Sequence, residues 1–154
     1  MNHLLRLLSR AFMASMWVAT ALAVQVQAQA QASATDDSVY RAWGGKDGIR
    51  AVMEDFVPRL EADARIGKFF RREGRDNLVA QLTDQLCKIS GGPCTYGGAP
   101  MNLVHRDLEI TKADFNALVE VLQLSMAAKG IAFGAQNAML ARLAPMHRDI
   151  IAKE

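Results

Sequence analysis

Apolar residues recur at intervals of three and four along most of the chain beyond Asp37, and this spacing is the strongest limit on its fold. Stripes of this kind run through residues 49–60, 78–89, 115–126 and 139–151. Such spacing places apolar side chains on one face of an α-helix. No segment alternates apolar and polar residues with a period of two between turn signals, as a strand would. The sequence therefore predicts an all-α fold.

Proline and capping signals indicate where these helices bend, begin and end. Pro58 should bend or end the first long helix, and Pro145 should kink the last one. Asp76 is the expected N-cap of the second long helix. Thr111 and Asp114 resemble a capping box, which would open the third.

The N-terminal segment has the pattern of a secretory signal peptide. Arg6 and Arg10 precede an apolar run over residues 11–24, and small residues follow it, with cleavage expected near Ala30 or Ala32. The apolar run is short for a membrane span, and an uncleaved anchor is the alternative. We therefore expect an exported protein, located in the periplasm.

Cleavage leaves one domain of nearly neutral charge. We expect residues 1–32 to be the signal peptide, 33–38 a flexible tail and 39–154 the folded domain. The whole chain has 18 Lys and Arg against 16 Asp and Glu, and two of the arginines leave with the leader. The sequence pI of 8.7 therefore gives no support for a nucleic-acid partner, which would need a basic patch. We also expect no stable membrane insertion after cleavage.

A stiff, glycine-rich stretch separates the second and third long helices. The glycine pairs Gly91-Gly92 and Gly97-Gly98 each lie near a proline and prevent one regular element from spanning the stretch. Beyond them, Met101 and Val104 have helical spacing, and His105 lies on the same apolar face. An imidazole presented this way is similar to the proximal iron ligand of a globin. A buried histidine bonded to a backbone carbonyl is the alternative.

The order and spacing of several motifs over residues 39–151 resemble the group I truncated haemoglobins, short globins with two helix pairs stacked two over two. The matching motifs are Gly44-Gly45, residues 49–56, Phe69-Phe70, residues 91–98, residues 101–105 and Gly130. The resemblance implies one haem b per chain, held at its iron by His105, and reversible binding of a diatomic ligand (oxygen, nitric oxide or carbon monoxide).

The resemblance also implies a role for each matched position. His105 would bind iron through Nε2, while its other ring nitrogen donates to a backbone carbonyl and so fixes the ring. Other residues would surround the haem: Phe56, Phe70, Leu78, Leu82 and Met101. The pocket for the ligand, on the distal side of the haem, would be formed with Val57, Gln81 and Gln85.

The distal side departs from the commonest pattern of the family. Most members have a tyrosine where Val57 stands, and its hydroxyl donates a hydrogen bond to the ligand. Several have a distal histidine where Gln81 stands, so we expect no iron held between two histidines. Gln81 and Gln85 are the remaining candidate donors, and a solvated helix face is their alternative role.

Cys87 and Cys94 lie seven residues apart and are not followed by the histidine of a Cys-x-x-Cys-His motif. Covalent attachment of haem through these cysteines is therefore not expected. In an oxidising compartment the pair indicates a disulfide, and two reduced buried thiols are the alternative. A zinc site with His105 would lack a fourth ligand.

Several functions fit a haem protein of this kind because the iron performs the chemistry. Oxygen binding or transport and nitric oxide detoxification are the principal ones. An enzymatic role as a nitric oxide dioxygenase or in peroxidase-like turnover stays open, as does an electron-donor protein. The alternative from another class is a haem-free helical interaction module of the cell envelope.

Overall fold

The computed structural model describes residues 36–70 and 74–152, and the predicted leader lies outside them. The regular elements are α2 (Ser38–Ala42), α3 (Gly45–Ala62), η1 (Gly67–Phe69), α4 (Arg75–Ile89), α5 (Met101–Val104), α6 (Lys112–Ala128), α7 (Phe133–Leu143), η2 (Ala144–Met146) and α8 (His147–Ile150). Within the described ranges every element is helical and no strand occurs, so the predicted all-α class is confirmed. None of these helices is both long and apolar enough to cross a membrane.

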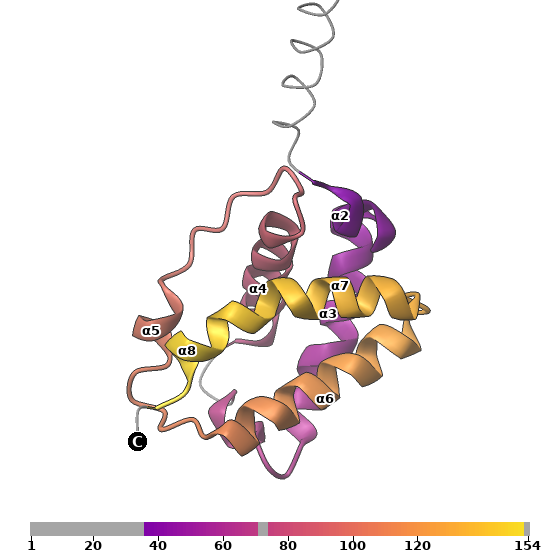
Figure 1. Ribbon diagram of the computed structural model, residues 1–154. Coiled ribbons are helices and arrows are strands. Elements are labelled where there is room, and N and C mark those ends of the chain that lie inside the picture. Colours follow the sequence, from indigo (N-terminus) through magenta and orange to yellow (C-terminus); the bar gives the residue numbers. More distant parts are fainter. Residues whose placement is uncertain (1–35, 71–73, 153–154) are drawn as a thin grey trace, which may run out of the picture. The chain divides into compact units, whose positions relative to one another are not determined.

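The four long helices form two pairs. α3 packs against α4, α6 packs against α7, and α3 also contacts α6. Figure 1 shows α6 and α7 crossing in front of α3. This arrangement is the predicted two-over-two stack of helix pairs.

The predicted apolar stripe of α3 forms the centre of the core. Ile49, Met53 and Leu60 are fully buried, and Phe56 is nearly so. Burying one such side chain contributes about 1.5 to 3 kcal/mol. Trp43, just after α2, is also buried, and its indole Nε1 donates to the Ala135 carbonyl at 3.1 Å. This hydrogen bond ties the N-terminal end of the domain to α7.

The two prolines behave differently from each other. Pro58 lies inside α3, which continues to Ala62 without ending there. The carbonyl that loses its partner belongs to Glu54, an exposed residue, so water can satisfy it. Pro145 does interrupt its helix, because α7 ends at Leu143 and the chain continues as the 3₁₀ turn η2.

One predicted cap is confirmed and one is wrong. Thr111 Oγ1 accepts from the Asp114 amide at 3.2 Å, and the Thr111 amide donates to the Asp114 carboxylate at 3.0 Å, which completes the capping box of α6. The N-cap of α4 is Gly74, and Asp76 lies in the first turn instead. An acidic residue there still interacts favourably with the helix dipole, which explains the similar sequence signal.

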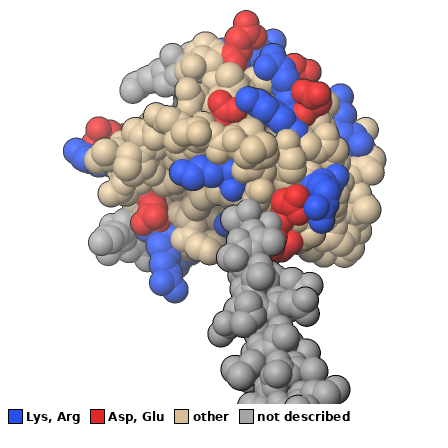
Figure 2. Space-filling model, turned by 90° about the horizontal axis from the view of Figure 1, so that it is seen from above, with Lys and Arg blue, Asp and Glu red and all other residues tan. Residues whose placement is uncertain are grey.

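Charged side chains of both signs are interspersed on the face of the molecule shown in Figure 2. Among the described residues, many charged side chains form ion pairs on or near the surface, including Arg41 with Asp37 at 2.7 Å and Arg50 with Glu54 at 2.9 Å. Exposed pairs of this kind contribute little to stability. The charges on this face therefore do not gather by sign.

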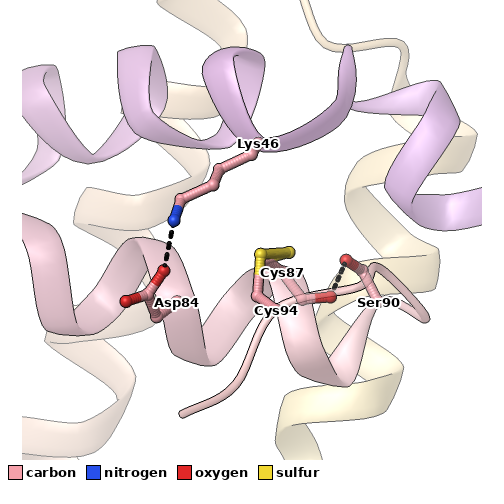
Figure 3. Close-up of a disulfide and its surroundings, with 5 residues drawn as sticks. All are labelled: Lys46, Asp84, Cys87, Ser90 and Cys94. Carbon is pink, nitrogen blue, oxygen red and sulfur yellow. Dashed lines mark hydrogen bonds and ion pairs between the residues drawn. A yellow bond between two sulfur atoms is a disulfide. The ribbon is translucent and has the colours of Figure 1, made fainter.

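A disulfide joins the end of α4 to the loop that follows it. The sulfur atoms of Cys87 and Cys94 are 1.97 Å apart, and Figure 3 shows Cys94 approaching α4 from the loop. Ser90 Oγ donates to the Cys87 carbonyl at 2.9 Å and helps to close the end of the helix. A Cβ on Gly92 would lie 2.7 Å from Cys87 Sγ, so the loop fits closely over the bridge. Because both sulfurs are bonded to each other, neither is free to bind zinc.

This bridge should make stability sensitive to reductant. For a sequence separation of seven, the chain-entropy model gives about 2.5 kcal/mol. We expect the reduced protein to lose about that free energy of unfolding in urea, while a variant with both cysteines replaced by alanine shows no response to reductant. The denatured, unreduced wild type should contain no titratable thiol. Two thiols in that assay would contradict the bridge.

Candidate functional site

A cavity of about 730 Å³ lies among the long helices. Its walls are mostly apolar, and they include Met53, Phe56 and Leu60 from α3 and Leu118 and Leu122 from α6. Its volume falls within the range of about 300 to 1,000 Å³ that holds small molecules and cofactors in proteins. The core therefore contains a site large enough for an organic cofactor.

All but one of the residues predicted for the site line this cavity. The residues brought together are Phe56, Phe70, Leu78, Gln81, Leu82, Gln85, Met101 and His105. They come from α3, the end of η1, α4 and the α5 segment, which are far apart in sequence. The predicted neighbourhood is thus assembled by the fold.

Val57 is the residue that the cavity wall does not include. It follows Met53 by four residues and precedes Leu60 by three, and both of these line the cavity. Helical geometry therefore turns Val57 towards the same side of α3. Its short side chain is nevertheless completely buried among core residues. The expectation that Val57 itself forms part of the pocket surface thus differs from the structure.

His105 is the one imidazole among the described residues that line the cavity. Its Nδ1 lies 2.8 Å from the Met101 carbonyl oxygen. A carbonyl can only accept, so Nδ1 carries the hydrogen and donates it. Nε2 is then the nitrogen with a free lone pair, which is the form of imidazole that binds a metal. The bond also fixes the ring relative to α5, of which His105 is the C-cap.

The two candidate distal glutamines lie in different surroundings. Gln81 is exposed, although it also borders the cavity. Gln85 is buried, and its Nε2 lies 3.4 Å from the Met101 sulfur. The alternative prediction, that these glutamines lie on a solvated helix face, therefore describes Gln81 better than Gln85.

Some cavity residues were not predicted from the sequence. Phe115, Leu118 and Leu122 lie on the apolar stripe of α6, so the periodicity that predicted the helix already contained the signal. Tyr96 lies in the irregular loop, where no periodicity exists to indicate its direction. Its hydroxyl donates to the Ala99 carbonyl at 3.4 Å, and burial raises the pKa of the phenol.

A carboxylate also borders the cavity. Asp114 lines it at the start of α6, and the hydroxyl of Thr111 donates to that carboxylate at 2.6 Å. This side-chain hydrogen bond is the main cause that lowers the pKa of Asp114. The capping box therefore also keeps a negative charge at the cavity edge.

Two stacked helix pairs around an apolar cavity with one oriented imidazole define a protein of the globin class. A family model described as bacterial-like globin matches residues 38–152. The chain belongs to this family. It is therefore a haem-binding globin that takes a diatomic ligand, and the haem-free interaction module finds no support.

Relatives and solved structures agree with this assignment. A group 1 truncated hemoglobin of Tetrahymena pyriformis is 26% identical over 116 residues, covering 75% of this chain and 96% of the relative. A group 1 truncated hemoglobin from Mycolicibacterium paratuberculosis is 29% identical over 117 residues, covering 76% of this chain and 86% of the relative. The crystal structure of the Fe(III) form of the T. pyriformis protein has a TM-score of 0.72 at 26% identity, covering 75% of this chain and 98% of that one.

Proposed function

We propose that this chain binds one haem b non-covalently, with His105 as the proximal iron ligand. The observation that carries the proposal is the hydrogen bond from His105 Nδ1 to the Met101 carbonyl, which leaves Nε2 free in an apolar cavity of suitable size. The haem iron supplies reversible binding of a diatomic ligand. Oxygen binding or transport, or detoxification of nitric oxide, is the role that we infer.

The chain's own residues orient the cofactor and exclude water. The carbonyl partner of His105 fixes the ring and increases the basicity of Nε2. Phe56 and Phe70 offer aromatic surface, and Leu78 and Leu82 offer aliphatic surface, for packing against a flat macrocycle. An apolar wall of this kind would keep water away from the iron of a bound haem and would set the polarity of the ligand pocket.

Two further proposals, on the type of haem attachment and on the cellular location, are supported by the cysteines and by the leader pattern. The sequence has no Cys-x-x-Cys-His motif, and both cysteines are in the bridge, so no thiol is available for c-type attachment. We propose export to the periplasm, because of the leader pattern and because a structural disulfide persists in an oxidising compartment. N-terminal sequencing of the mature protein should begin after Ala30 or Ala32, and an intact leader would contradict export by cleavage.

Titration of the apoprotein with haemin tests the proposed cofactor. The absorbance of the complex should rise until one equivalent is added and then remain constant. Acid and organic solvent should then remove all of the haem, because no covalent bond holds it. Haem that stays with the protein after extraction, or an endpoint other than one equivalent, would contradict the proposal.

A further inference from the structure

The bridge between Cys87 and Cys94 lies outside the cavity, so a bound haem would not displace it. Neither cysteine is among the described residues that line the cavity, although Leu86 of the same helix turn is. The Cys87 side chain is completely buried, and Cys94 is partly buried on the loop. Because the link is covalent, it persists when the cavity is filled.

The end of α4, on one side of the bridge, is well fixed to the rest of the domain. The Tyr40 amide of α2 donates to the Ser90 carbonyl at 3.3 Å. Arg142 of α7 donates through Nη1 to the Ile89 carbonyl at 3.0 Å. Two helices that are distant in sequence therefore hold the place where Cys87 lies.

The loop on the other side of the bridge has few attachments of its own. Within the described part of the chain, residues 93–99 form no hydrogen bond between backbone groups. The Tyr96 hydroxyl donates only to Ala99 of the same loop. The helix that follows, α5, has four residues and none of them is buried, and so short a helix is not stable by itself. The bridge therefore supplies an attachment to the core that this loop otherwise lacks.

This same loop supplies part of the cavity wall and leads to the proposed iron ligand. Tyr96, Gly98 and Ala99 line the cavity, and His105 follows eleven residues after Cys94. A haem bound at His105 needs this segment in one arrangement, and ordering a loose segment on binding costs conformational entropy. A bridge that already restricts the segment removes part of that cost.

We propose that the bridge couples haem retention to the redox state of the protein's surroundings, so that haem is held tightly only by the oxidised chain. This inference rests on the proposed function. A chain kept reduced before export would hold haem weakly, and tight binding would follow oxidation of the cysteines. The partner implied is a protein that exchanges thiols and disulfides.

The exchange needs two electrons and two protons, which a dithiol supplies as it becomes a disulfide. Cys94 is the more accessible sulfur, so a thiolate of the dithiol would attack there and form a mixed disulfide. Cys87 leaves as a thiolate and takes up a proton. The second thiol of the dithiol then attacks its own mixed sulfur, which releases Cys94 as a thiol. Oxidation by a disulfide donor reverses these steps.

The haem affinity of the bridged and the reduced protein tests the proposal. The affinity is obtained from the rates of haem uptake and of haem transfer to a scavenging apoglobin. The reduced wild type and the variant Cys87→Ala/Cys94→Ala should each bind haem about tenfold less tightly than the bridged wild type, a typical coupling between two sites. Reductant should leave the affinity of the double variant unchanged.

The same coupling must appear in the converse measurement, because it is reciprocal. Wild-type protein with and without haem is equilibrated with mixtures of reduced and oxidised dithiothreitol, and the free thiols are alkylated and counted. The holoprotein should need an about tenfold higher ratio of reduced to oxidised dithiothreitol for half-reduction. This change corresponds to a midpoint about 30 mV more negative for the two-electron couple.

A destabilised variant with its bridge intact is the matched control, because losing the bridge also lowers the stability of the whole domain. Met139 is completely buried on α7 and is not among the described residues that line the cavity. Met139→Ala should lose stability on the scale of the bridge and still hold haem as the wild type does. Equal weakening of haem binding by Met139→Ala would overturn the proposal. Equal affinity of the bridged and reduced wild type, or a midpoint that haem leaves unchanged, would also overturn it. A bridged wild type that binds no haem would instead contradict the proposed function.

Discussion

The variant His105→Ala should lose tight binding of haem. Removing a residue that only supports a metal ligand commonly lowers metal affinity by about tenfold to a hundredfold, so removal of the ligand should exceed a hundredfold. No other imidazole lines the cavity within the described residues, so the protein has no histidine there to replace it. Transfer of haem to a scavenging apoglobin measures the loss. Added imidazole should partly restore a histidine-like ferrous spectrum, because it can occupy the vacated space.

His147→Ala is the matched control for this experiment. His147 makes an edge contact with the Phe115 ring, with centroids 4.9 Å apart, and does not line the cavity. This variant should retain haem with the spectrum of the wild type. If His105→Ala keeps the ferrous spectrum of the wild type, His105 does not bind the iron.

The second large effect is expected on the distal side, in Val57→Tyr. Dioxygen gains partial negative charge on binding, and a hydroxyl that donates to such an acceptor contributes about 1.5 to 3 kcal/mol. Val57 faces the side of α3 from which Met53 and Leu60 reach the cavity, so a longer side chain can extend into it. Oxygen release should therefore slow by at least about tenfold. Release of carbon monoxide, which is less polar when bound, should change much less.

Val57→Phe separates the hydroxyl from the added bulk. Both aromatic variants enlarge a fully buried side chain, which can cost about 1 to 3 kcal/mol of stability. Only the tyrosine adds a donor, so only Val57→Tyr should slow oxygen release, as measured by stopped-flow ligand displacement. Equal slowing by both variants would indicate restricted exit. The wild type could instead release oxygen slowly, with Gln81→Leu accelerating that release. This result would show that a glutamine already supplies the hydrogen-bond donor to oxygen.

The sequence was sufficient to predict the long helices, because a core requires apolar residues at helical spacing. α3, α4 and α6 coincide with predicted stripes, whereas the last stripe, 139–151, begins within α7 and continues through η2 into α8. The capping box at Thr111 was predictable too, since its partners are three residues apart. The cap at Asp76 was not, because an acidic residue in the first helical turn favours the helix from several positions.

The positions of the site residues were predictable where a local sequence pattern places them, and less so where contacts between distant residues do. His105 lies on the apolar face that its neighbours predicted, and its carbonyl partner is only four residues away. Contacts of Gln85 with Met101 and Met146 join residues from separate elements, for which no local pattern exists. Val57 is buried behind the cavity wall because its side chain is short for its place in the packed core. Apolar periodicity predicts which side of the helix a residue faces, but it does not predict how far the side chain reaches.

Absorption spectra of the wild type supplied with haemin, in the ferric, ferrous and carbonyl forms, show directly whether the cavity holds haem at His105. We expect an intense Soret band in each form. The ferrous protein should be five-coordinate, because His105 is the one imidazole in the described cavity wall, and carbon monoxide should shift the band sharply. A protein with no Soret band after haemin is supplied would contradict the claim that this cavity holds haem. A six-coordinate ferrous spectrum would contradict the claim that His105 is the sole protein ligand.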